Sequence, residues 1–65
     1  MYTIVFTHNN IEWYLIEEET LWFSDKPRDH KDMLKYKSKE HAMLVMMACK
    51  ECYHRGMVLD VKEVD

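Results

Sequence analysis

The side chains best suited to chemistry are Cys49 and Cys52, spaced as Cys-x-x-Cys at the end of the run "MLVMMACKEC". Such a pair can supply half of a zinc site or cycle between a dithiol and a disulfide. A structural zinc site needs four ligands, usually from a second Cys or His pair. No second pair exists here. The histidines are scattered, at His8, His30, His41 and His54. We therefore expect neither a metal nor another cofactor.

Redox chemistry at this pair is also disfavoured by its position. A reactive Cys-x-x-Cys gains thiolate character at a helix N-terminus. The pair instead lies near the C-terminal end of the helix predicted below, where the helix dipole opposes a negative charge. The simplest interpretation is two buried free thiols that act as small hydrophobic groups. A small metal or redox protein that uses Cys49 and Cys52 is the alternative.

No other arrangement of side chains indicates catalysis. Gly56 is the single glycine, so no glycine-rich loop can cradle a phosphate. The acidic run Glu17-Glu18-Glu19 could attract a cation, but successive strand residues point to opposite faces of a sheet. A solvated turn explains it better. We predict that the protein is not an enzyme.

Length and composition indicate one small globular domain, residues 1–65. A hydrophobic share of 48% is too high for intrinsic disorder, and a formal charge of −3 without a basic stripe argues against nucleic-acid binding. No apolar run reaches the ~18 residues of a membrane helix. The lack of a charged-then-apolar leader, together with free thiols, predicts a cytoplasmic protein.

Residues 2–24 have the pattern of β-strands. Apolar and polar residues alternate over residues 2–7, and Asn9-Asn10 can supply the positive φ angles of a two-residue hairpin loop. This loop fixes the register of the first hairpin. The predicted pairs are Phe6 with Trp13, Ile4 with Leu15 and Val5 with Tyr14.

The second connection has two candidate registers. A three-residue turn at Glu17–Glu19 pairs Leu15 with Leu21, and likewise Trp13 with Phe23 and Tyr14 with Trp22. A two-residue turn at Glu18-Glu19 instead pairs Ile16 with Leu21 and Leu15 with Trp22. We favour the first, because it gathers four large apolar side chains on one face. These are Trp13, Leu15, Leu21 and Phe23.

The rest of the chain predicts a loop, a helix and a last strand. Residues 25–37 are polar and form the loop, with a candidate edge strand at Met33–Tyr36. A helix follows from Lys39 to Arg55, capped by Ser38 and closed by Gly56. Residues 57–64 form the final strand. The fold class is therefore α+β: a small antiparallel sheet in the order β-β-β-α-β, with one helix packed across one face.

Two apolar surfaces are left over in this fold. A helical stripe of Ala42, Val45, Met46, Cys49, Cys52 and Tyr53 packs on the sheet, which leaves Met43, Leu44 and Met47 as a candidate homodimer interface. On the opposite face of the sheet lie Val5, Tyr14, Ile16 and Trp22. The loop Asp25–Lys37, a second copy or another protein could cover that face. RNA is disfavoured there, because the flanking residues are glutamates.

The layout resembles the small sheet-plus-helix proteins of bacteriophages, many of which bind and inhibit a host enzyme. The similar features are the strand-rich start, the single helix "KSKEHAMLVMMACKECYHRG" and the short last strand "MVLDVKEV". This resemblance implies an inhibitor that acts in the host cytoplasm.

Together these observations predict a non-enzymatic module that occludes a surface of a larger protein. Tyr14 and Trp22 are the predicted anchors, and Glu17, Glu18 and Glu19 would face a basic patch on the partner. A homodimeric structural or regulatory protein, assembled through the helix, is the alternative function.

Overall fold

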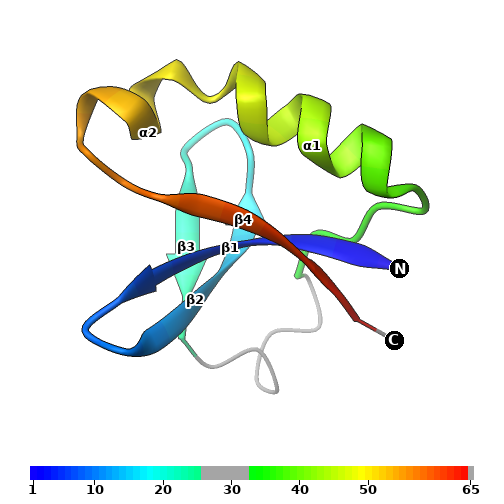
Figure 1. Cartoon of the computed structure of the whole chain (residues 1–65), viewed down its shortest axis with the longest axis horizontal. Coiled ribbons are helices and arrows are strands. Elements are labelled where there is room, and N and C mark those ends of the chain that lie inside the picture. The colour runs from blue at the N-terminus through cyan, green and yellow to red at the C-terminus, as the bar shows by residue number, and fades with distance from the viewer. Residues whose placement is uncertain (26–32, 65) are drawn as a thin grey trace.

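The computed structural model describes residues 1–25 and 33–64 of the chain. Within these residues, the elements are β1 (Tyr2–His8), β2 (Ile11–Glu17), β3 (Trp22–Ser24), α1 (Lys39–Ala48), α2 (Lys50–His54) and β4 (Leu59–Glu63). The strands form one antiparallel sheet in the order β3-β2-β1-β4, and α1 lies across one face of it (Figure 1). The predicted α+β class is confirmed.

The first hairpin has the predicted register. Asn9 and Asn10 adopt φ angles of 52° and 64°, as a two-residue hairpin loop of this kind requires. Val5 lies opposite Tyr14, and Phe6 lies opposite Trp13. The local turn chemistry therefore fixes this half of the sheet.

Both predicted registers of the second hairpin are wrong. Leu15 pairs with Phe23 and Glu17 pairs with Trp22, with an irregularity between Leu15 and Glu17. The connection includes Leu21, which adopts a positive φ of 51° that a leucine side chain normally disfavours. Because the real register differs from the favoured one by two positions, Leu15 and Phe23 still share the core face.

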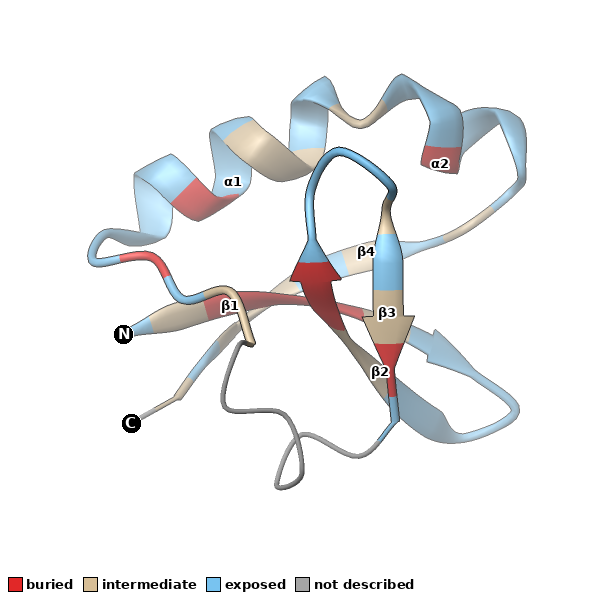
Figure 2. Cartoon of the chain, turned by 180° about the vertical axis from the view of Figure 1, so that it is seen from behind, coloured by how far each residue is buried: buried red, intermediate tan, exposed pale blue. Residues whose placement is uncertain are grey.

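The core lies between the sheet and α1. Ile4, Leu15, Tyr36 and Ala42 form its buried centre. Buried residues, red in Figure 2, gather on β1 and β2 beneath α1. The half-buried side chains around this centre are Tyr2, Phe23, Leu34, Val45, Met46, Leu59 and Val61.

The segment before α1 bonds to both central strands. Tyr2 and Tyr36 exchange two backbone hydrogen bonds of 2.8 and 2.7 Å, and the Leu34 amide donates to the Leu15 carbonyl at 3.1 Å. The fully buried Thr3 hydroxyl donates to the Leu34 carbonyl at 2.8 Å. The predicted edge strand at Met33–Tyr36 is present as a single bridge between Tyr2 and Tyr36.

The predicted single helix from Lys39 to Arg55 is wrong, because it breaks at Cys49. Ser38 caps α1 as predicted, and its hydroxyl accepts from the His41 amide at 3.0 Å. Cys49 then leaves the helical region with a ψ of 73°. No Gly or Pro lies between Lys39 and Arg55 to cause a break.

The feature that coincides with the break is a disulfide between Cys49 and Cys52. The expectation of two free thiols is therefore wrong. After α2, Gly56 adopts a φ of 72°, and the amides of Gly56 and Met57 donate to the carbonyls of Tyr53 and Cys52 at 3.0 and 2.9 Å. These two bonds close the helix in the way that the glycine predicts.

Candidate functional site

An open groove of about 470 Å³ lies between the helices and the sheet. The turn between β2 and β3 rises toward the junction of α1 and α2, and both views of the ribbon show this approach (Figures 1 and 2). Apolar side chains from the sheet, the turn and α1 line the groove: Ile4, Leu15, Leu21, Phe23, Val45 and Leu59. Ala48 and Cys49 line it at the helix break.

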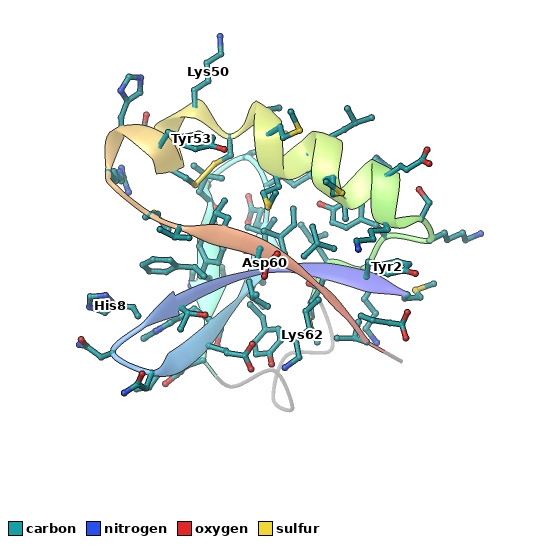
Figure 3. All side chains as sticks on the ribbon, viewed as in Figure 1. Tyr2, His8, Lys50, Tyr53, Asp60 and Lys62 are labelled. Carbon is teal, nitrogen blue, oxygen red and sulfur yellow. A yellow bond between two sulfur atoms is a disulfide. The ribbon has the colours of Figure 1, made fainter. Side chains whose placement is uncertain are left out.

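Charged residues of the β2–β3 turn and α2 complete the lining. Glu18 and Glu19 come from the turn, and Lys50 and Glu51 come from the start of α2. Three carboxylates thus accompany one ammonium group. Lys50 also extends away from the sheet in Figure 3. The groove therefore combines apolar walls with an excess of negative charge.

Two of these carboxylates are held by neighbouring side chains. The Tyr36 hydroxyl donates to a Glu18 carboxylate oxygen. Glu51 forms an ion pair with Arg55 at 3.2 Å, one helical turn further on, and both side chains are exposed. Tyr36 belongs to the buried core, so its bond to Glu18 ties the tip of the turn to the segment before α1.

This contact predicts a pH-dependent stability. Burial raises the pKa of Tyr36 well above its ordinary value, and the hydrogen bond to Glu18 and the charge of that carboxylate raise it further. The folded state therefore favours the neutral phenol. Its contribution is complete below the unfolded pKa of about 10 and is lost as the pH rises toward the higher folded pKa.

We expect Tyr36→Phe to lower the free energy of unfolding by about 1 kcal/mol near neutral pH, because one hydrogen bond is removed. The difference between the wild type and the variant should shrink above a pH of about 10. Urea unfolding between neutral pH and pH ~11 measures both curves. A constant difference across this range would contradict the assignment.

The predicted partner-binding residues fall into two groups. Trp22 is 56% exposed, and Glu17, its partner across the hairpin, is also exposed. Glu18 and Glu19 line the groove. The β2–β3 turn and its flanks thus bring four of the five predicted residues together.

Tyr14 belongs to a separate polar cluster. Lys62 donates to the Tyr14 hydroxyl at 3.1 Å and to Glu12 at 2.8 Å, and its ammonium lies 5.5 Å from the centre of the Tyr14 ring. The hydrogen bonds to Glu12 and Tyr14 raise the pKa of Lys62 above its ordinary value. Tyr14 is half-buried and does not line the groove.

The sheet face opposite α1 is less exposed than predicted. Val5 and Ile16, which were expected on an open surface, are only 4% and 8% exposed. The predicted cover, the loop Asp25–Lys37, lies partly outside the described residues, at positions 26–32. Trp22 is the strongly exposed member of the predicted apolar set on this face.

The outer side of α1 agrees with the sequence pattern. Met43, Leu44 and Met47 are exposed and remain the predicted surface for self-association. Tyr53 was expected to pack on the sheet but is exposed, because the break at Cys49 changes the helical phase of α2. None of the helices in the described ranges is long and apolar enough to cross a membrane.

Metal chemistry has no evident centre in the part of the chain that the structure describes. No group of three or more His, Cys, Asp or Glu side chains there could hold a metal ion. Comparison with known proteins finds no matching family model, no matching curated protein and no matching solved structure.

Proposed function

We propose that the protein is a non-enzymatic interaction module that occludes a surface of a larger protein, a host protein if the chain is phage-encoded. Its groove takes a short basic segment of that partner, one that alternates Lys or Arg with large apolar side chains. The observation that carries this proposal is the combination of apolar walls with carboxylates from two separate elements. The partner's apolar groups fill the groove and its cations meet Glu18, Glu19 and Glu51.

The size of the groove favours side chains of an extended segment. Sites of about 300–1,000 Å³ take small molecules or a few side chains. Burial of apolar surface supplies the affinity, and complementary charge supplies orientation and selection against acidic segments. Trp22, the first residue of β3, does not line the groove, but it offers a large exposed aromatic surface of the kind that anchors interfaces.

The groove itself is tested by a blocking substitution. Ala48→Trp places a large side chain on the groove wall, whereas Met47→Trp adds the same side chain one position earlier, where the residue does not line the groove. The probe is a peptide of alternating Lys and Leu, with peptides of alternating Glu and Leu and of alternating Lys and Ser for comparison. We expect the Lys–Leu peptide to bind the wild type and Met47→Trp, and to bind Ala48→Trp at least tenfold more weakly.

The charge of the site is tested in the same titrations. Replacement of Glu18 and Glu19 by Gln should weaken Lys–Leu peptide binding about fivefold and reduce its salt dependence, because two solvent-exposed ion pairs are lost. Glu40→Gln, at an exposed position on α1 outside the groove, is the matched control.

Trp22→Ala should cost more than ~1 kcal/mol of binding free energy with the fold intact. Equal binding of the Lys–Leu and Glu–Leu peptides, or full binding by Ala48→Trp, would overturn the proposal.

A further inference from the structure

The two sulfurs of the disulfide differ in their surroundings. Cys49 is half-buried and lines the groove, whereas Cys52, in α2, is buried and only 1% exposed. Figure 3 shows the yellow sulfur–sulfur bond beneath α2. Because Cys52 is buried and Cys49 is the residue of the pair that lines the groove, we expect an incoming nucleophile to attack the bond at Cys49.

We propose that Cys49–Cys52 is a thiol–disulfide exchange site, and that its substrate is a polypeptide segment carrying two thiols that lies in the groove. The role of the groove as the substrate's seat rests on the function proposed above. The exchange site itself stands on the disulfide and on the difference in access between its two sulfurs.

The chemistry is a two-electron exchange in two steps. A thiolate of the substrate attacks the Sγ of Cys49, so that an intermolecular disulfide forms as the Cys49–Cys52 bond breaks. The electron pair of that bond leaves on Cys52, which takes up a proton and becomes a buried thiol. The second thiolate of the substrate then attacks the substrate sulfur of the mixed disulfide and releases Cys49 as a thiolate. The substrate is oxidised to a disulfide and the protein pair is reduced to a dithiol.

Cys49 lies where a segment bound in the groove can reach it. Ala48, Cys49 and Lys50 lie where α1 ends and α2 begins, and all three line the groove. A segment held by the apolar walls would carry its cysteine past the accessible sulfur at high effective concentration. The same break that interrupts the helix therefore places the reactive sulfur at the binding surface.

The first experiment asks whether the folded protein exchanges thiols. Wild-type protein is treated with dithiothreitol, with and without urea, and its thiols are counted by mass spectrometry after alkylation. We expect reduction under native conditions at a rate far above that of global unfolding, and reoxidation by oxidised glutathione. Reduction only as fast as the chain unfolds would overturn the proposal, since the bond would then be structural.

Single-cysteine variants test which sulfur reacts. Cys52→Ser leaves the accessible Cys49 and should form a mixed disulfide with oxidised glutathione. Cys49→Ser leaves the buried Cys52 and should react at least about tenfold more slowly. Circular dichroism verifies that each variant is folded. If one variant does not fold, the reduction experiment on the wild-type protein still tests the proposal. Equal rates in two folded variants would overturn the assignment of Cys49.

A final arm separates the exchange site from the groove. Two peptides, each with one cysteine activated as a thionitrobenzoate disulfide, carry either Lys and Leu or Glu and Leu around it. We expect Cys52→Ser to react faster with the Lys–Leu peptide, and the preference to fall when Glu18 and Glu19 are replaced by Gln. Equal peptide rates alongside intact glutathione exchange would overturn the groove's role, and with it the proposed function, while leaving the exchange site supported.

Discussion

Replacement of Ile4 by alanine is expected to lower the free energy of unfolding by about 2–5 kcal/mol. Ile4 is 1% exposed and lies at the centre of the core with Leu15, Tyr36 and Ala42. The truncation removes buried apolar surface and leaves space that the neighbouring strands cannot fill completely. A domain of this length has a total stability of roughly 3–10 kcal/mol, so much of the population should unfold in dilute urea.

Ile11→Ala is the matched control, because it deletes the same atoms at a site that is 46% exposed. Ile11 lies at the loop end of the first hairpin, opposite His8. Its truncation should cost less than about 1 kcal/mol. Urea unfolding followed by tryptophan fluorescence gives both values, with an unchanged slope against urea expected for each variant. Similar losses at the two sites would contradict this placement of the core.

The sequence-based prediction is accurate where the structure depends on residues close together in the sequence, and less accurate where it depends on distant ones. The first hairpin was predicted correctly because Asn9 and Asn10 tolerate positive φ and carry the turn signal themselves. The register of the second turn was predicted wrongly because the turn depends on Leu21 in a left-handed conformation. A leucine in the sequence gives no signal for that conformation. Strand alternation still placed Leu15 and Phe23 on the correct face, because that face survives a two-residue shift.

The helix shows a different limit of sequence patterns. Periodicity over Lys39–Arg55 favoured one continuous helix, and it predicted correctly that Met43, Leu44 and Met47 are exposed. The pattern carries no information on whether Cys49 and Cys52 are joined. The break at Cys49 then moved Tyr53 out of the predicted packed stripe. The burial of Cys52 was predicted, and its bonding was not.

The candidate groove could be predicted only in part. The acidic run was recognised as a partner-binding feature, and Glu18 and Glu19 do line the groove. The apolar walls come from positions as distant as Ile4 and Leu59, which only the folded sheet brings together. Strand alternation assigned Tyr14 to the same surface as Trp22, and its bond to Lys62, 48 residues away, has no local signature in the sequence.

Reduction of the disulfide is expected to lower the free energy of unfolding by about 2 kcal/mol. Cys49 and Cys52 are three positions apart, so the bond closes a very short loop and restricts the unfolded chain only modestly. Urea unfolding of the same protein, oxidised and fully reduced, measures this difference without any change of sequence. The reduced protein should remain folded in the absence of urea, because the buried centre of Ile4, Leu15, Tyr36 and Ala42 includes neither cysteine.

The size of this loss distinguishes a disulfide that the fold requires from one that can be reduced and reformed in the folded protein. A variant with alanine at both positions should be insensitive to reductant, and it reports any additional cost of removing the buried Cys52 sulfur. A loss of about 2 kcal/mol on reduction leaves a folded dithiol state, which reversible exchange at Cys49 requires. Complete unfolding on reduction would contradict both the predicted loss and the exchange site, because the dithiol form would then have no groove in which to hold a substrate.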